Sequence, residues 1–461
     1  EKCPMANKVE HAKVISVSNA LRHGDTFTRL SAVIMGTGNI CRKQVVKGLL
    51  YLAVEILFIA FMVINGFGLL GGLTTLGTNE GGEVFNEAKQ VYEYTAGDNS
   101  MLILLYGILA VFAIIAFVFA WRSSLKSAYQ AQVLKEAGKP LPGFCEDVAS
   151  LFDQNLHKTL LTGPIICIFA FTILPLVFMA AIAFTNYDRN HQPPGKLFDW
   201  VGLANFGKLL DSSSGLGTAF WHVLGWTIVW AVFATFLNYI LGMILAIVIN
   251  RKETKWKAMW RFIFVLSIAI PQFVSLLVIR TMLQPEGSIN VLLKQLGLIQ
   301  KSLPFWTDVT WARITIIVVN LWVGVPYTML QVTGILQNIP ADLYEAARVD
   351  GANAVVQFFK ITLPYMLFVT TPYLITQFIG NINNFNVIYL LTKGAPAALS
   401  YNNGTAGKTD LLVTWLYKLT MDFKDYNYAA VISIAVFILS AVFSLAAYRK
   451  SGALKNEEGF Q

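Results

Sequence analysis

The feature that most constrains this chain is a series of long apolar runs without a single charge. Residues 102–121 read LILLYGILAVFAIIAFVFAW, and residues 428–448 read YAAVISIAVFILSAVFSLAAY. A helix of about 20 apolar residues spans the hydrocarbon core of a bilayer, because it satisfies its backbone polar groups internally. Only 13% of the residues are charged, whereas soluble domains carry roughly 25%. We therefore predict an all-α, polytopic membrane protein.

About eight runs meet the length criterion for a transmembrane helix. We predict spans at residues 49–70, 101–121, 160–185, 223–249, 262–283, 312–335, 365–391 and 428–448. This order divides the chain into four parts. They are an N-terminal segment at residues 1–48, two accessory transmembrane helices within residues 49–125, a six-helix core within residues 160–450, and a polar loop inside that core at residues 340–364.

The N-terminal segment has two interpretations that stay open. Phe27, Leu30, Val33 and Ile34 recur at near-helical spacing. This spacing fits a helix that lies in the membrane interface. A disordered leader is the alternative.

The distribution of basic residues predicts which loops face the cytoplasm, because Lys and Arg are enriched on that side. Residues 250–261 read NRKETKWKAMWR, and basic residues also gather between the second and third spans. The first outer loop is mostly acidic, with Glu80, Glu83 and Asp98 among its residues. The alternation places both termini and residues 340–364 in the cytoplasm. Basic loops beside anionic lipid explain the net charge of +8 without a nucleic-acid partner.

Residues that could support catalysis are scattered along the chain. The five histidines form no cluster, and Cys3, Cys41, Cys145 and Cys167 lack the spacing of metal ligands. No GxxxxGK[ST] nucleotide-binding motif occurs in the sequence. We therefore predict that the chain is not an enzyme, and that any ATP-driven work depends on another subunit.

Glu55 is the clearest ionisable residue within a predicted span. A proton-coupled carrier needs a titratable group near the middle of the membrane, which is one interpretation of this residue. The other is that its side chain extends to the nearby cytoplasmic surface.

The sequence EAARVDGANAVVQFFKITLP, at residues 345–364, lies between two predicted spans. Pro340 suits the first position of a helix, and ADLYEAARV continues it with good helix formers. Gly351 permits a sharp turn because glycine tolerates positive φ. A second short helix follows, and Pro364 is expected to open the next span. Four apolar side chains in this segment need cover, either from a partner or from the protein's own spans. They are Tyr344, Val355, Phe358 and Phe359.

This segment resembles the EAA loop of ATP-binding-cassette (ABC) importer permeases. The matching pattern is Glu-Ala-Ala, a glycine six residues after the Glu, and a Leu-Pro pair before the next span. In that family the loop docks into a cleft on a separate ATPase subunit. The resemblance implies that ATP and Mg²⁺ bind to the partner ATPase subunits and that this chain holds no cofactor of its own. The residues implied in coupling are Glu345, Ala346, Ala347, Asp350 and Gly351.

Other segments resemble the larger permease subunit of maltose and maltodextrin importers. They read WVGLANF at residues 200–206, LWVGVPYTML at residues 321–330 and NINNFNVIYLLTKGAP at residues 381–396. The resemblance implies the type I ABC importer permease fold, with a cytosolic coupling helix, in a bacterial plasma membrane. It also implies oligosaccharide import by alternating access. The implied partners are a second permease subunit, two ATP-binding subunits and an external sugar-binding protein.

In that family the sixth and seventh of eight spans hold the sugar. The matching positions in this chain are Val323, Gly324, Tyr327, Gln377, Asn381 and Asn384. Amides and a phenol can hydrogen-bond sugar hydroxyls, and a tyrosine ring can cover the C–H face of a sugar. Hydrogen bonding between helices is the alternative role for the Asn residues. The family's maltose site has an aromatic ring where this chain has Gly380, which leaves room for a bulkier or differently linked oligosaccharide, including a plant-derived one.

Two other functions stay open at this point. An ion-coupled secondary carrier would move its substrate without an ATPase, and an ABC permease could carry a solute other than sugar. The spans hold few ionisable residues, which favours the ATP-driven importer over the carrier.

Overall fold

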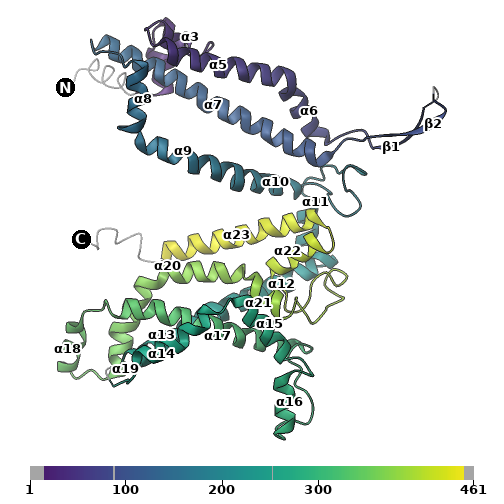
Figure 1. The fold of residues 1–461 in the computed structure, drawn as a ribbon, viewed down its shortest axis with the longest axis vertical. Coiled ribbons are helices and arrows are strands. Elements are labelled where there is room, and N and C mark those ends of the chain that lie inside the picture. The colour runs from purple at the N-terminus through teal and green to yellow at the C-terminus, as the bar shows by residue number, and fades with distance from the viewer. Residues whose placement is uncertain (1–14, 87–88, 252, 451–461) are drawn as a thin grey trace. The chain divides into compact units, whose positions relative to one another are not determined.

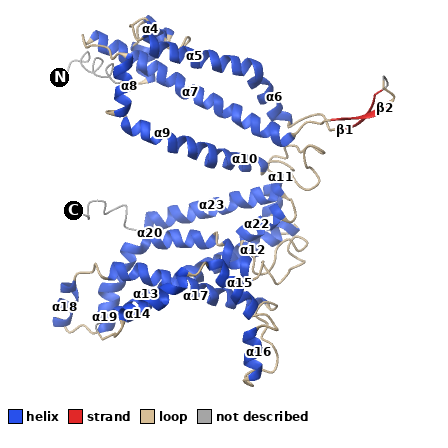
Figure 2. Ribbon diagram, viewed as in Figure 1, coloured by secondary structure: helices blue, strands red, loops and turns tan. Residues whose placement is uncertain are grey.

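The computed structural model describes residues 15–86, 89–251 and 253–450. These residues form helices almost throughout, and their two strands make one hairpin (Figures 1 and 2). The prediction of an all-α membrane protein is confirmed. The chain divides into two compact units, one ending at Trp200 and the other beginning at Val201. Cys3 and residues 1–14 of the predicted N-terminal segment lie outside the described residues.

Seven described helices are long and apolar enough to cross a membrane. They are Val45–Thr75, Ser100–Glu136, Leu156–Ile182, Gly215–Asn250, Val309–Leu336, Ala354–Leu391 and Tyr426–Arg449. The remaining predicted span, residues 262–283, is a pair of helices that bends by 87°. Pro271 lies at the break, and Ile270 before it is extended (φ −81°, ψ 129°). A proline disfavours helical backbone in the preceding residue, so the helix does not run straight through.

The unit that ends at Trp200 contains three long helical segments. The first is α5 (Val45–Phe61), η1 (Met62–Gly66) and α6 (Phe67–Thr75); the second is α7 (Ser100–Glu136); the third is α9 (Leu156–Ile168), η2 (Phe169–Ile173) and α10 (Leu174–Ile182). The strands β1 (Gly82–Asn86) and β2 (Val91–Thr95) pair antiparallel between α6 and α7. A short helix, α8 (Phe144–Phe152), connects α7 to α9.

Three short helices precede α5 and pack on α7. They are α2 (Val17–His23), α3 (Thr26–Leu30) and α4 (Thr37–Ile40). The buried Arg42 guanidinium links these short helices to α7. It lies 2.6 Å from Asp25 Oδ1, and it also donates a hydrogen bond to the Ala128 carbonyl oxygen of α7. Burial alone would raise the pKa of Asp25, but hydrogen bonds from Thr28 and the charge of Arg42 outweigh it and lower that pKa. The residues of the predicted interfacial face are all exposed. They are Phe27, Leu30, Val33 and Ile34.

Glu55 has a partner within the fold. Its Oε2 accepts a hydrogen bond from the backbone amide of Met35 at 2.7 Å. Met35 is fully buried, so the carboxylate satisfies an amide that water does not reach. The contact ties α5 to the loop between α3 and α4, which is a structural role for this residue.

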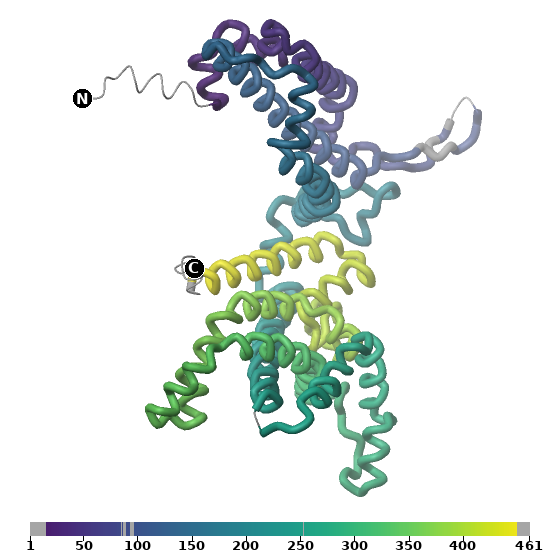
Figure 3. The backbone as a smooth tube through the Cα atoms, turned by 60° about the vertical axis from the view of Figure 1, so that its left-hand side comes forward, coloured from purple at the N-terminus to yellow at the C-terminus, as the bar shows by residue number. Residues whose placement is uncertain are grey.

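The unit that begins at Val201 holds the remaining helices, which the tube in Figure 3 traces from teal to yellow. They are α11 (Ala204–Leu210), α12 (Gly215–Val232), η3 (Phe233–Leu237), α13 (Asn238–Asn250), α14 (Lys257–Ala269), α15 (Gln272–Met282), α16 (Ser288–Gln295), α17 (Val309–Leu336), α18 (Ala341–Val349), α19 (Ala354–Gln357), η4 (Phe358–Thr362), α20 (Leu363–Ile382), α21 (Phe385–Leu391), α22 (Leu412–Met421) and α23 (Tyr426–Lys450). The helices α18 and α16 lie at opposite ends of the long helices in both views.

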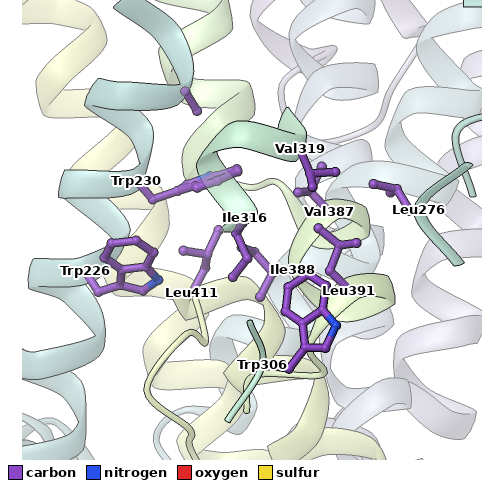
Figure 4. Close-up of a cluster of buried hydrophobic side chains, with 11 residues drawn as sticks. Trp226, Trp230, Leu276, Trp306, Ile316, Val319, Val387, Ile388, Leu391 and Leu411 are labelled. Atoms are coloured by element: carbon purple, nitrogen blue, oxygen red, sulfur yellow. The ribbon is translucent and has the colours of Figure 1, made fainter. Parts of the chain in front are cut away.

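Two apolar clusters hold this unit together. The first gathers α12, α15, α17 and α21 around Trp226, Trp230 and Trp306 (Figure 4). The Trp230 indole N–H donates to the Asn381 carbonyl oxygen at 3.1 Å, so the buried ring keeps a hydrogen bond. The second cluster lies between α13, α17 and α20 and includes Met329 and other buried apolar residues. These clusters fix the helices that carry the residues described next.

Candidate functional site

The polar loop of the core is a helix–turn–helix segment made of α18 and α19. Helix α18 begins at Ala341, one residue later than the sequence predicts, with Pro340 as its N-cap. Gly351 turns the chain with φ +79°, a conformation that residues with a Cβ rarely adopt. Its amide donates to the Arg348 carbonyl oxygen at 3.0 Å, which closes the end of α18. Asn353 caps the start of α19 by accepting a side-chain hydrogen bond from a backbone amide.

The apolar side chains of this segment fall into two groups. Tyr344 and Phe358 pack against the second apolar cluster, and Tyr344 Oη lies 2.9 Å from Thr362 Oγ1. Val355 and Phe359 stay uncovered, with 63% and 59% of their surface exposed. The protein's own spans therefore cover only half of the four apolar residues that need cover.

The five predicted coupling residues lie on α18 and in the turn after it. Ala347 is partly buried, and the other four, Glu345, Ala346, Asp350 and Gly351, are exposed. Within the described part of the chain, the Glu345 carboxylate has no ion pair or hydrogen bond. A segment that exposes both a free carboxylate and uncovered apolar side chains suits a protein surface that is partly basic and partly apolar.

The segment runs into the next span without a break. Helix α19 continues through the π-helical turn η4 into α20. Pro364 lies in the first turn of α20, as expected, but the chain is already helical there, because the helix starts ten residues earlier, at Ala354. A proline ring clashes with the carbonyl four residues before it, and the wider π turn just ahead of Pro364 relieves that clash. Helices α19 and α20 are therefore parts of one continuous helix.

A polar cavity of about 50 Å³ lies between η3, α13, α17 and α20. Three of the six predicted sugar-contact residues line it: Gly324 and Tyr327 from α17, and Gln377 from α20. The other lining residues are Ala234, Thr235, Asn238, Tyr239, Thr328, Tyr373 and Leu374. The lining has hydroxyl, phenol and amide groups but no charged side chain, which suits a neutral ligand rich in hydroxyls.

Asn238 presents an unused acceptor at this cavity. Its Nδ2 donates to the Ala234 carbonyl oxygen at 2.7 Å, whereas its buried Oδ1 has no partner among the described protein groups. A buried polar atom left without a hydrogen bond costs about 1–3 kcal/mol. The Oδ1 atom is therefore well suited to accept a hydrogen bond from a ligand hydroxyl or a water molecule.

The other three predicted sugar-contact residues do not line the cavity. Asn381 is buried, and its Nδ2 donates to Thr235 Oγ1 at 3.0 Å. Asn384 Nδ2 lies 3.4 Å from Asn381 Oδ1, while Asn384 Oδ1 accepts from the Val387 amide at 3.3 Å and caps α21. Val323 packs against the first apolar cluster. Asn381 thus makes the hydrogen bond between spans that we considered as the alternative role, and through Thr235 it is linked to the cavity wall.

Sequence reasoning missed several polar residues of the cavity wall, chiefly Thr235, Asn238, Tyr239 and Tyr373. Two signals could have revealed them. Asn238 interrupts an apolar span, where an uncompensated amide is costly. Tyr373 precedes Gln377 by four residues and therefore shares its helix face.

Metal ligands are not gathered in the described ranges. They contain no group of three His, Cys, Asp or Glu side chains that could hold a metal ion. Cys41, Cys145 and Cys167 are unpaired and exposed.

A bundle of membrane-spanning helices with an uncharged polar cavity and an exposed loop between two spans defines a membrane transport permease. The chain belongs to the family described as "Binding-protein-dependent transport system inner membrane component", whose sequence model matches residues 238–451.

Relatives at 36% identity match nearly the whole chain. It is 36% identical over 431 residues to the galactooligosaccharides transport system permease protein GanP of Bacillus subtilis (strain 168), covering 93% of this chain and 98% of that protein. It is 36% identical over 440 residues to the maltodextrin transport system permease protein MalC of Streptococcus pneumoniae serotype 4, covering 93% and 96%. The predicted membership in the maltodextrin-type group of carbohydrate ABC permeases is confirmed.

A solved structure has a similar fold. One chain of a bacterial alginate ABC transporter, solved in complex with an alginate pentasaccharide-bound periplasmic protein, matches with a TM-score of 0.54 and 21% identity. The match covers 67% of this chain and 98% of that chain. At this identity the likeness concerns the fold alone, and it confirms the predicted ABC importer permease fold.

Proposed function

We propose that this chain is the permease subunit of an ATP-driven importer of oligosaccharides. Two relatives that match it over 93% of its length are named for the transport of galactooligosaccharides and maltodextrin. The observation that carries the proposal is the α18–α19 segment. It leaves Val355 and Phe359 uncovered, and it continues directly into a span. Such a segment is suited to bind a separate ATP-hydrolysing subunit and to transmit its movement to the span.

The coupling step follows from the shape of this segment. Glu345 and the exposed side chains of Val355 and Phe359 contact an ATP-binding subunit. Closure of that subunit displaces α18 and α19, and the continuous helix carries the displacement into α20. Because α20 forms one wall of the cavity, the cavity changes shape when that subunit closes. ATP and Mg²⁺ are held by the ATP-binding subunits.

The proposed assembly contains a second permease subunit, two ATP-binding subunits and an external sugar-binding protein. It lies in the bacterial plasma membrane with both termini of this chain in the cytoplasm. The basic loop at residues 250–261 and the acidic residues of the first outer loop support this orientation. The α18–α19 segment then faces the cytoplasm, where ATP is available.

Gln377, Tyr327 and Asn238 are proposed to contact the sugar. A cavity of about 50 Å³ holds only a few atoms, so this chain supplies one wall of a path that the second permease completes. Asn381 and Asn384 join the site when the path opens. Their mutual hydrogen bond is long, at 3.4 Å, and is exchanged for bonds to sugar hydroxyls. Gly380 leaves open space beside this path, because no atom lies within 4 Å of the position of a Cβ there.

The proposal is tested by purifying the chain with the subunits that accompany it. ATP hydrolysis by the assembled complex is then measured in lipid with a panel of oligosaccharides and the sugar-binding protein. We expect at least one oligosaccharide to stimulate hydrolysis. A complex that assembles with an ATPase but responds only to a non-sugar solute contradicts the substrate class.

A further inference from the structure

A large cavity in the unit that ends at Trp200 has no part in the transport path described above. It has a volume of about 760 Å³ and lies between α5, α7, α8 and α9. Arg122 and Lys126 line it; Arg122 directly follows the uncharged run of α7, at residues 102–121, and Lys126 comes four residues later. The cavity therefore lies where the apolar part of a span gives way to polar residues.

The cavity is strongly basic. Lys47, Arg122, Lys126 and Lys158 line it, and Asp147 is the one acidic residue among its lining residues. The Lys47 Nζ lies 3.2 Å from both Asp147 carboxylate oxygens, so this pair is neutral overall. Lys158 donates to an amide oxygen, which leaves its charge uncompensated.

Arg122 and Lys126 are the two most available cations. They are four residues apart on α7 and so share one helix face. Within the described residues, neither side chain has a hydrogen bond or ion pair. Two like charges one helical turn apart repel each other, and an anion bound between them would remove that repulsion.

Apolar side chains border the same cavity. Leu50 and Phe119 line it from α5 and α7 and are exposed. Helix α8 adds Phe144, Val148 and Leu151, which recur at helical spacing and are also exposed. A short helix with one apolar face beside a cationic pocket is typical of a segment that lies in the membrane interface.

We propose that this cavity binds the phosphate of an anionic phospholipid headgroup. Arg122 and Lys126 contact the phosphate, and Lys158 adds a third positive charge. The acyl chains then lie along Leu50 and Phe119, on the membrane side of the cations. A free phosphate ion would satisfy the same charges, but it leaves these apolar residues without a role.

The test uses the full chain in its assembled complex, purified in detergent with equal amounts of phosphatidylglycerol and phosphatidylcholine. Native mass spectrometry measures which lipid remains bound. We expect wild type to retain phosphatidylglycerol in preference, and Arg122→Gln with Lys126→Gln to weaken its binding about thirtyfold. The charge-conserving pair Arg122→Lys with Lys126→Arg should retain it.

Lys135→Gln with Lys139→Gln is the matched control, because it removes two positive charges that follow the same apolar run but do not line this cavity. An equal loss of lipid in this control would mean general attraction to basic loops and would overturn the site. Displacement of the bound lipid by millimolar inorganic phosphate would overturn the lipid assignment. Equal retention of the two lipids by wild type would overturn both.

Discussion

The side chain of Asn238 occupies the space that a side chain at residue 324 would need. A Cβ built on Gly324 lies 2.5 Å from Asn238 Nδ2 and 2.8 Å from its Oδ1. Both residues line the polar cavity, so the glycine on α17 is what allows the amide on α13 to stand in the cavity wall. The absence of a side chain at Gly324 on one span therefore determines where the Asn238 amide lies on another span.

Gly324→Ala should therefore displace Asn238 and reduce sugar uptake while the complex still assembles. Overpacking of this kind costs about 1–3 kcal/mol. Gly334→Ala is the matched control, because it lies on the same helix α17, a Cβ there meets no atom within 4 Å, and the residue does not line the cavity. Uptake into proteoliposomes is the measurement, and equal uptake by the two variants would contradict this role for Gly324.

Glu345→Lys should uncouple sugar uptake from ATP hydrolysis. It reverses a free, exposed charge on the docking face without disturbing any recorded contact of α18. Glu286→Lys is the control, since it makes the same charge change at an exposed turn between α15 and α16. We expect uptake per ATP to fall at least tenfold in the first variant and to stay near wild type in the second. Normal coupling in both would argue against the docking role of Glu345.

Gly351→Pro should also uncouple transport, because proline fixes φ near −65° and cannot adopt +79°. It also removes the amide that bonds to Arg348. Gly351→Asn separates backbone conformation from side-chain size, since Asn tolerates left-handed backbone and no atom lies within 4 Å of a Cβ there. The Asn variant should keep most of the activity. The account of the turn is wrong if Asn is as damaging as Pro.

Asn381→Ala with Asn384→Ala tests the proposed extension of the sugar path. The two substitutions remove the hydrogen bond from α20 to Thr235 and the N-terminal cap of α21, so we expect a modest loss of thermal stability. They also remove two proposed sugar contacts, so we expect reduced sugar-stimulated ATP hydrolysis. Asn383→Ala is the control, because that side chain is exposed and bonds only within its own helix. Thermal destabilisation with unchanged sugar response would limit the two residues to a structural role.

Asp410→Asn should destabilise the unit that begins at Val201. The buried Asp410 carboxylate accepts from Gly407 N and Lys418 Nζ, both at 2.6 Å, and from Thr414 Oγ1 at 2.8 Å. Removing one partner of a buried ion pair costs about 3–5 kcal/mol, because the other charge is left uncompensated. The apparent melting temperature should fall by several degrees, and Asp422→Asn, at an exposed position, should leave it unchanged. Equal melting temperatures would show that the pair is not stabilising.

Much of the fold could be predicted because the bilayer imposes a simple length rule on apolar helices. Seven spans lie where the sequence places them, and the helix–turn–helix segment follows from Gly351 and its flanking helix formers. The sequence analysis missed the break at Pro271 because the residues on both sides of it are apolar. A hydropathy criterion therefore predicts one continuous span there. Pro364 lies in the first turn of α20, as predicted, but the helical continuity from α19 was not predicted, since a π turn lets the helix run on into a proline.

The candidate site could be predicted only in part. The resemblance selected positions on two spans, and three of them, Gly324, Tyr327 and Gln377, line the cavity. The third wall comes from α13 and η3, and which face of those helices turns inward depends on packing against α17. Spacing within one helix does not contain that information. Asn381 shows that residue type alone does not identify a sugar contact. Its amide could hydrogen-bond a sugar, but in the structure it donates to Thr235.

The most direct test of the central claim is sugar uptake by proteoliposomes with and without the ATP-binding subunits. The account predicts uptake against a concentration gradient only when those subunits and ATP are both present, and none from the permease subunits alone. Uphill uptake by a preparation free of any ATPase, driven by an ion gradient, would contradict it.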